Sequence, residues 1–452
     1  MTLSELNAEL FDEQGRGWPA RVSPASGLSL RVHFTGARPA TTTFPKLVVT
    51  HGARTITLSA CRLVELEQLV FTEDVYDCRL LVEQGRLKNL LGFFNELPLV
   101  LAQRTEVTEG FRGFVADLIY DLTVYKKFFD EQDRTFSKEA PHVGIGAQEV
   151  LLRRAGPEFF RFLDLNLERL GTLVRDFSPE QNERHGYYFR QQLWPFILGS
   201  AFMERTNLKP RGYAGDATMM QMIYDDRYEG AWAFNKLMHR HPVQHPAAAA
   251  VRNRRVLIPR LLNAHLARST AAPYRVLSVA CGPARELEDV IKGLGGAAAV
   301  DPKRLELTLL DQDDEALAAA RATMAPLTQP LKLTLVNDSV RTLLRDRTAG
   351  ERWGRFDFIY SMGMFDYLTP PVAKAVLRRL YELLAPGGAL VVGNYHVNNP
   401  SRFYMAYWLD WVLYYRTEDE LAALGEGLPD AMVKVGFDDT GCQMFLTVER
   451  RA

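Results

Sequence analysis

A turn rich in small residues, SVACGPARE at 278–286, is the first segment whose residue types suit ligand binding. It follows a short apolar strand and contains Gly282 between Ala280 and Ala284. Small residues let the backbone approach a ligand closely, and the N–H groups of a following helix point towards it. The strict glycine spacing of a dinucleotide-binding turn is absent, so this turn alone equally predicts an ordinary strand–helix connection.

Polar side chains follow the next two predicted strands. Asp311 ends an apolar run, where a carboxylate can hydrogen-bond both ribose hydroxyls of a nucleoside. Asn337 and Asp338 end the third strand, where their side chains can hydrogen-bond an adenine edge. The alternative role of such residues is to cap the following helix. Their order along the chain favours a nucleoside site.

A second group of candidates follows the fourth and fifth strands. The segment 361–367 (SMGMFDY) follows the fourth strand, and 394–402 (NYHVNNPSR) follows the fifth strand and leads into an aromatic run at 403–415. The aromatic run predicts either a helix packed on the sheet edge or one wall of an apolar small-molecule pocket. The polar candidates for that pocket are Tyr395, His396, Arg402 and Arg416.

The segment RGYAG at 211–215 predicts a rigid loop over the site, since its glycines allow unusual backbone angles. Arg211 and Tyr213 in this loop are further substrate-binding candidates. The histidines of 239–245 do not predict a metal site, because side chains two residues apart diverge on a helix and Pro242 interrupts it.

Three regions must position these residues. The first 105 residues contain short β-branched runs at 28–34, 46–50, 55–58, 63–71 and 75–82, which predict a small β-barrel or sandwich. Apolar residues then recur at steps of three and four, which predicts helices. These helices are expected at 111–125, 150–177, 187–202, 216–239 and 247–267, with Pro242 and Pro246 breaking the pattern.

The last region alternates short apolar strands with helices. Strands are expected at 275–279, 306–310, 332–336, 356–360 and 389–394, and helices at 285–292, 315–324 and 371–384. This alternation predicts an α/β fold with a mostly parallel sheet covered on both faces, whose ligands bind beyond the carboxyl ends of the strands. The predicted domains are 1–105, a small β-barrel; 106–250, a helical cap; and 251–452.

Bulk properties exclude several classes. The 452 residues carry 54 Lys and Arg against 55 Asp and Glu, so a whole-chain nucleic-acid footprint is not expected. No apolar run approaches the roughly 18 residues that span a bilayer, and the acidic N-terminus does not resemble a secretory signal. The four cysteines form no CxxC pair, which favours a reducing compartment and disfavours structural zinc. We expect a cytoplasmic protein with a small-molecule substrate and no integral membrane segment, and a homodimer is the candidate assembly.

The ordered set of strand ends at 250–452 resembles the class I S-adenosylmethionine (SAM) dependent methyltransferases, which have a Rossmann-like, seven-stranded sheet. The resemblance implies SAM as the cofactor, with Gly282 at its methionine end, Asp311 at the ribose and Asp338 near the adenine. The full set of cofactor-binding residues expected from it is Ala280, Gly282, Asp311, Asn337, Asp338, Ser361, Met362 and Gly363. The sequence departs from the family at 280 and 284, where alanines replace glycines, and at Ser278, where an acidic residue is usual.

The motifs RGYAGD, AVRNRR and GNYHVNNPSRFYMAYWLDWVLYYRT resemble a bacterial group of methyltransferases for the methyl ester of 3-hydroxypalmitic acid. This implies carboxyl O-methylation of a fatty-acid-like substrate. A carboxylate is ionised at neutral pH, so it needs desolvation and in-line placement rather than a strong base. For an amine or hydroxyl acceptor, His396 or Tyr367 are the candidate catalytic bases.

Arg16, Arg21 and the segment 23–27 (SPASG) weakly resemble the PilZ domain, a cyclic-di-GMP sensor fold, although their spacing differs from its signature. A degenerate structural or dimerising β-domain is the favoured interpretation. Two alternatives to the fatty-acid methyltransferase stay open. One is a natural-product N- or O-methyltransferase, and the other is a cyclic-di-GMP-linked regulatory protein with a non-catalytic methyltransferase fold.

Overall fold

The computed structural model describes residues 6–26, 29–34, 39, 41, 43–51, 54–65, 78–81, 106–294, 298–327, 331–340, 344 and 353–451. The chain divides into two compact units. The first comprises residues 1–112 with 176–188, and the second comprises 113–175 with 189–452. No helix of the described residues is long and apolar enough to cross a membrane.

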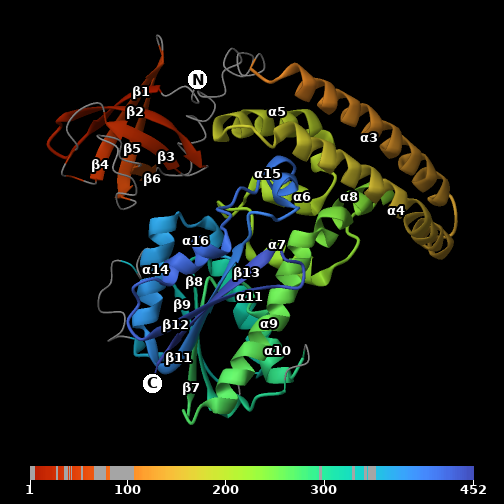
Figure 1. The fold of residues 1–452 in the computed structure, drawn as a ribbon. Helices are drawn as coiled ribbons and strands as arrows, with labels where there is room; N and C mark the ends of the chain where they lie inside the picture. The colour runs from red at the N-terminus through yellow and green to blue at the C-terminus, as the bar shows by residue number, and fades with distance from the viewer. Residues whose placement is uncertain are drawn as a thin grey trace. The chain divides into compact units, whose positions relative to one another are not determined.

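The N-terminal unit contains a closed antiparallel barrel of six strands, in the order β1-β2-β3-β6-β5-β4 (Figure 1). The strands are β1 (Leu6–Phe11), β2 (Gly17–Ser26), β3 (Ser29–Phe34), β4 (Thr43–His51), β5 (Arg54–Glu65) and β6 (Cys78–Leu81). Leu10, Val22, Val32, Leu47 and Val49 fill its interior. The predicted small barrel is confirmed, although the sequence pattern missed β1 and β2. Parts of two expected strands, 66–71 of the one and 75–77 with 82 of the other, lie outside the described residues.

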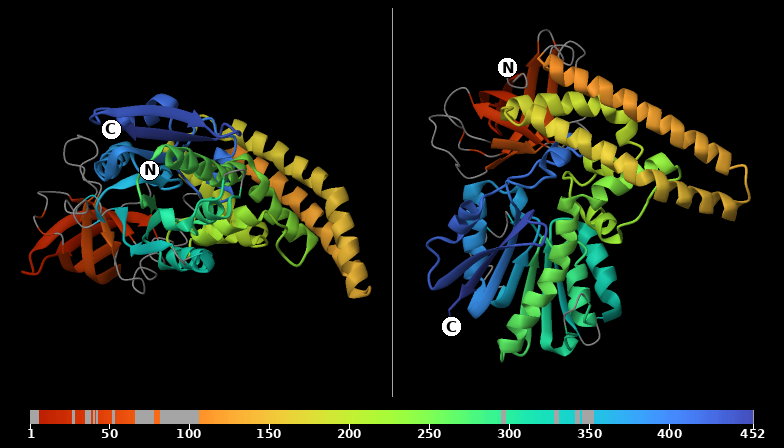
Figure 2. Two further views of the ribbon diagram at one scale, coloured as in Figure 1. Left: turned by 90° about the horizontal axis from the view of Figure 1, so that it is seen from below. Right: turned by 45° about the vertical axis from the view of Figure 1, so that its right-hand side comes forward.

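Between residues 106 and 270 the structure describes the helices α3 (Glu109–Phe136), α4 (Pro141–Val174), α5 (Pro179–Ile197), α6 (Ala201–Leu208), α7 (Ala217–Asp225), α8 (Ala233–Gln244) and α9 (Pro246–Arg268). The long helices α3 and α4 lie side by side (Figures 1 and 2), joined by ring contacts such as Tyr125 with Phe159 at 5.1 Å. The expected helix at 216–239 is two helices, because Asp226 and Gly230 adopt positive φ angles of 46° and 125°. Pro242 lies inside α8, two residues before the helix ends at Gln244, whereas Pro246 is the first residue of α9. Helix α9 therefore crosses the predicted boundary at 250.

The C-terminal sheet has seven strands in the order β12-β13-β11-β10-β7-β8-β9. Its elements are β7 (Tyr274–Val279), α10 (Arg285–Lys292), β8 (Leu305–Asp311), α11 (Asp314–Met324), β9 (Lys332–Asn337), β10 (Phe356–Ser361), α14 (Pro370–Glu382), β11 (Leu384–Tyr395), α15 (Arg402–Tyr407), α16 (Glu418–Ala422), β12 (Ala431–Phe437) and β13 (Gln443–Arg450). Strands β7 to β11 are parallel and β13 is antiparallel to β11. This is the predicted mostly parallel, Rossmann-like sheet.

Helices cover both faces of this sheet (Figure 1). Val276 of β7 packs with apolar residues of α9, α10 and α11, whereas its neighbour Leu277 packs with those of α14 and α16. Successive side chains of a strand point to opposite faces, so a strand buried on both sides is apolar at every position. The predicted aromatic helix is short, because α15 ends at Tyr407 and the chain from 408 to 417 is irregular.

Candidate functional site

The turn between β7 and α10 keeps a glycine-type backbone without the usual glycines. Ala280, Gly282 and Ala284 have φ angles of 52°, 53° and 50°, all in the left-handed region. A Cβ atom built on Gly282 would meet nothing within 4 Å, so the space over this turn is open to a ligand. The alanines therefore preserve the cradle, at a conformational cost of about 1–2 kcal/mol each.

Asp311, at the end of β8, is 5% exposed and is tied to this turn. Its Oδ2 accepts the Gly282 N–H at 2.9 Å, and its Oδ1 accepts the Asp313 N–H at 3.0 Å. Burial raises the pKa of the Asp311 carboxyl, and these two N–H donors oppose that shift. A carboxylate has two lone pairs on each oxygen, so acceptor positions remain for ribose hydroxyls.

The end of β9 is joined to the end of β8. The Asp338 N–H donates to the Asp311 carbonyl at 3.1 Å, and the Asn337 side chain donates to the same oxygen at 3.4 Å. Asp338 Oδ1 accepts the Ser339 N–H at 2.7 Å, a local turn contact that leaves its other oxygen for a ligand. The predicted ribose and adenine residues thus lie together at one edge of the sheet.

Ser361, Met362 and Gly363 follow β10, which neighbours β7 in the sheet. Ser361 Oγ is buried and has no hydrogen-bond partner among the described residues. The Met362 carbonyl accepts from Arg254 Nη1 and from Gln443 Nε2, both at 3.1 Å. These residues line the same strand ends as the turn and Asp311.

Arg254 is a site residue that the sequence reasoning missed. It is 8% exposed, on the buried face of α9 with Val251 and Ile258. Its guanidinium bonds the Met362 carbonyl and Met220 Sδ, and lies 3.4 Å from the position that a Gly363 Cβ would take. The sequence did contain a signal for this residue, since Arg254 falls among the apolar positions of a predicted helix. A buried guanidinium is costly unless it binds a polar or charged partner, so an arginine at such a position indicates a binding role.

The loop of Arg211 and Tyr213 covers the end of β8. Arg211 pairs with Asp313 and Asp314, and with Glu315 at 3.2 Å, at the start of α11. Tyr213 Oη donates to Asp313 Oδ2 at 3.3 Å. Both predicted substrate residues therefore contact Asp313, two residues after Asp311, the carboxylate predicted for the ribose.

Tyr367 and Asp366 form the opposite wall. Trp411 Nε1 donates to Tyr367 Oη at 2.8 Å, and a Cβ on Gly215 would lie 2.8 Å from that oxygen. The RGYAG loop thus reaches from the cofactor strand ends to Tyr367. Asp366, which the sequence reasoning did not single out, is 2% exposed, and burial raises its pKa to about 7.

The other predicted acceptor residues have different environments. Arg416 is buried and donates to the carbonyls of Phe365 and Leu368 and to Asn394 Oδ1, so its guanidinium fixes the β10 and β11 loops. Tyr395 Oη donates to the Ala247 carbonyl at 2.8 Å.

The side chains of Arg402 and His396 make no hydrogen bond to Asp366 or Tyr367 among the described residues. Arg402 stacks on Phe403 and Tyr415 at 5.0 and 5.9 Å. His396 Nδ1 accepts the Asn398 N–H at 3.3 Å, and its ring packs edge-on against Phe437 of the edge strand β12.

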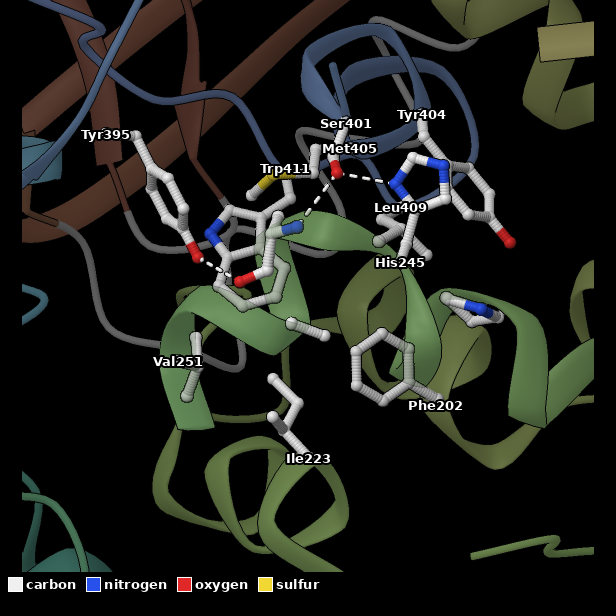
Figure 3. Close-up of a pocket in the computed structure, with 13 residues that line it drawn as sticks. Phe202, Ile223, His245, Val251, Tyr395, Ser401, Tyr404, Met405, Leu409 and Trp411 are labelled. Carbon is white, nitrogen blue, oxygen red and sulfur yellow. Dashed lines mark hydrogen bonds between the residues drawn. The ribbon is translucent and has the colours of Figure 1, made fainter. Parts of the chain in front are cut away.

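An apolar pocket lies where α6 to α9 meet the end of β11 and the segment 401–411 (Figure 3). Its walls are Phe202, Ile223, Pro242, His245, Ala247, Ala248, Val251, Tyr395, Ser401, Tyr404, Met405, Leu409 and Trp411. Ser401 Oγ bonds His245 Nδ1 at 2.5 Å and accepts the Ala247 N–H at 3.0 Å. Tyr395 and Trp411 belong both to this pocket and to the wall that holds Asp366 and Tyr367.

The polar groups of the pocket are kept neutral by burial. Burial lowers the pKa of His245 to about 4 and raises the pKa of the Tyr395 and Tyr404 hydroxyls well above the usual value. Burial also raises the pKa of Tyr367. No cluster of three or more potential metal ligands occurs within the described parts of the chain.

Comparison with known families gives one match, in which residues 276–388 match the model of a methyltransferase domain. No curated protein matches the chain. A solved structure similar to this chain is a possible exported protein from Bordetella parapertussis, at 20% identity, covering 66% of this chain and 98% of that one, with a TM-score of 0.46.

Two similar solved structures are methyltransferases. The magnesium protoporphyrin IX methyltransferase from Synechocystis with bound SAM is 12% identical, over 45% of this chain and 83% of that one, with a TM-score of 0.32. The 1,6-didemethyltoxoflavin-N1-methyltransferase from Burkholderia thailandensis is 20% identical, over 43% and 76%, with a TM-score of 0.30.

The family match and the order of the sheet define the C-terminal part of the chain as a Rossmann-like, class I methyltransferase domain, and the protein as a SAM-dependent methyltransferase. The residues present fit the cofactor. Three features lie at neighbouring strand ends: the open space over Gly282, the free acceptor positions of the Asp311 carboxylate, and the Ser361 Oγ that has no partner among the described residues.

Proposed function

We propose that the protein methylates the carboxyl group of an elongated apolar small molecule, such as a 3-hydroxy fatty acid. The observation that carries this proposal is the chemistry of the pocket walls, where aliphatic and aromatic groups surround neutral hydroxyls and a weakly basic imidazole. Such a site offers hydrogen bonds and desolvation but no strong base. That suits an acceptor that is already ionised at neutral pH.

SAM supplies an electrophilic methyl group when bound, and the chain's own residues hold it. In this proposal Asp311 binds the ribose hydroxyls, Asn337 and Asp338 face the adenine, and the turn at 280–284 borders the methionine end. Arg254 takes a role that the sequence reasoning left unassigned, as the clamp for the cofactor α-carboxylate. A buried guanidinium has already lost its hydration on folding, so it binds a carboxylate without a further desolvation cost of its own and gains a charged partner.

The acceptor side of the proposal also differs from the sequence interpretation. Arg211 and Tyr213 cover the cofactor rather than the acceptor, since their partners lie at the start of α11. Arg416 supports the acceptor wall through Phe365 and Leu368, so it positions other groups. In this proposal the aliphatic tail of the acceptor packs against the apolar walls between Phe202 and Leu409, which must move apart to admit it.

The test is methyl ester formation by the full chain with SAM and a panel of acids, including 3-hydroxypalmitate, 3-hydroxydecanoate and short acids such as 3-hydroxybutyrate. We expect ester from the long acids and little from the short one. Widening the pocket wall with Leu409→Ala should change the preferred chain length. Leu380→Ala, which removes the same side chain from the core under α14, is the matched control for lost stability. No ester from any carboxylic acid would overturn this function.

A natural-product N- or O-methyltransferase is the second candidate, and Asp366 is the observation that favours it. Among the described residues of the acceptor wall, this buried carboxyl is the one whose pKa, raised to about 7, suits a general base. Activity on amines or phenols, with none on acids, would select this candidate.

For the N-terminal barrel we propose a structural or dimerising role, with a PilZ-like fold as its nearest resemblance. The Arg16 guanidinium stacks on Trp18 at 4.5 Å, and Ser23–Ser26 are part of β2, while Gly27 lies outside the described residues. Calorimetry of the full chain with cyclic-di-GMP tests the alternative of a regulatory protein. Binding would favour that alternative, and an enzyme that turns over without binding the dinucleotide would exclude it.

A further inference from the structure

Asp366 is fixed at the junction of the cofactor strand ends and the acceptor wall. It lies five residues after the end of β10, in a short turn with Phe365 and Tyr367. Its Oδ1 accepts the Tyr395 N–H at 2.7 Å, and its carbonyl accepts the Tyr414 N–H at 2.7 Å. These two bonds hold its side chain against the wall to which the pocket residue Tyr395 belongs.

The second carboxyl oxygen of Asp366 is open. Oδ2 makes no hydrogen bond to any residue that the structure describes, and it is not one of the fully enclosed unpartnered atoms, as Ser361 Oγ is. A carboxyl group that is 2% exposed and uses one oxygen has lost most of its hydration without full compensation. Such a group gains most from a ligand that bonds the open oxygen.

The charged and titratable groups that face Asp366 come from each element packed around it. They are Arg254 of α9, Tyr367 of the same turn, Tyr395 of β11, and Tyr415 and Arg416 of the segment after α15. Burial has the largest effect on the pKa of Asp366 and favours its neutral form, although the guanidinium groups of Arg254 and Arg416 favour the anion. Neither arginine forms an ion pair with Asp366 within the described residues, since Arg416 bonds carbonyls and Arg254 bonds Met362 and Met220.

We propose that Asp366, as a neutral acid, donates a hydrogen bond from its open oxygen to the carboxylate of the methyl acceptor and so orients the attacking oxygen. This rests on the proposed function, and it names the recognition group for that substrate class. Two carboxyl groups in a dry site share one proton, because both cannot carry charge at close range.

The hydrogen bond holds one acceptor oxygen and leaves the other free for reaction. That free oxygen forms the new C–O bond as the methyl–sulfur bond breaks and its electron pair stays on sulfur. No proton is released, and Asp366 keeps its proton throughout. An ionised Asp366 would instead repel the acceptor, so carboxyl methylation should weaken as pH rises.

The test is the pH profile of kcat/KM for 3-hydroxydecanoate between pH 6 and 9 in the wild type and in Asp366→Asn. The wild type should be flat near pH 6 and fall towards tenfold per pH unit above neutrality. The asparagine keeps an oxygen for the Tyr395 N–H and a neutral donor, so its profile should be flat. Its affinity for S-adenosylhomocysteine (SAH) should match the wild type.

Asp357→Asn is the matched control, because Asp357 lies in β10 at the opposite end and accepts the Arg275 N–H at 2.7 Å. It should keep the wild-type profile. A second measurement needs no variant: binding of 3-hydroxydecanoate to the SAH-loaded wild type should weaken at least tenfold from pH 6 to 9, whereas binding of 3-hydroxydecanamide should not change.

The outcomes separate the two levels of the proposal. No ester and no acid binding would overturn the proposed function together with this assignment. Ester formation with parallel pH profiles for the wild type and Asp366→Asn would overturn only the role of Asp366, leaving it a structural residue. Activity that rises with pH and disappears in Asp366→Asn at every pH would make Asp366 a base, which also overturns the assignment.

Discussion

Replacing Arg254 with methionine tests the cofactor clamp directly. The Arg254 side chain is 8% exposed, and two of its partners are a carbonyl oxygen and a thioether, so N–H donors remain for an anion. One lost hydrogen bond to a charged partner costs about 1.5–3 kcal/mol, which is roughly a 10- to 150-fold loss of affinity. We therefore expect Arg254→Met to weaken SAH binding by that factor.

The assay compares two ligands by calorimetry. SAH carries the α-carboxylate, whereas 5′-methylthioadenosine has the same nucleoside without the amino-acid end. Arg254→Met should leave methylthioadenosine binding within about twofold of the wild type, and Arg254→Lys should recover part of the SAH affinity, because it restores charge without the planar fork. Asp311→Asn is the control for the nucleoside end and should weaken both ligands alike.

Two results would refute the reasoning. An equal loss for both ligands in Arg254→Met would mean that the variant damages the site as a whole, through the Met362 segment that Arg254 holds. An unchanged SAH affinity would mean that the cofactor carboxylate binds elsewhere, and that Arg254 serves another ligand.

Three further predictions concern the loops of the site and the charge of Asp366. Ala280→Gly should stabilise the protein by about 0.5–1 kcal/mol in urea unfolding, because it relieves a left-handed alanine at φ 52° that is exposed and loses little packing; a loss of stability would contradict the strain. Arg211→Gln should speed SAH dissociation about tenfold in stopped-flow experiments, since it releases the loop from three carboxylates at the start of α11; an unchanged rate would exclude the loop as a cover. Asp366→Asn should gain stability relative to the wild type as pH rises towards about 7 and should keep that gain at higher pH, because a carboxyl whose pKa is raised on folding loses its stabilising contribution between its unfolded and folded pKa values. The urea unfolding midpoints of Asp366→Asn and the wild type are compared at pH 5.5 and 8.5, and an equal difference between the two proteins at both pH values would contradict the raised pKa of Asp366.

The fold followed from local patterns in the sequence. Runs such as 274–279 and 305–311 are apolar at nearly every position because they are buried on both faces, and the turn and acidic residues after them occupy fixed places in a parallel sheet. Gly282, Asp311 and Asp338 could therefore be predicted as cofactor-binding residues without tertiary information, and their roles stay a prediction. The break between α7 and α8 was not, since it depends on Asp226 adopting a left-handed conformation that several residues can take.

The sequence by itself determined the class of sheet, its nucleoside-type strand ends and the helical character of the middle of the chain, because each depends on residues close together along the chain. Only the tertiary structure decided which charges face the site. Arg254 and Asp366 are brought to the strand ends by elements more than a hundred residues apart, while Arg416 uses its donors on backbone carbonyls and His396 packs against Phe437. Burial then sets the charge of each group, and burial is a property of the packed chain rather than of any segment of it.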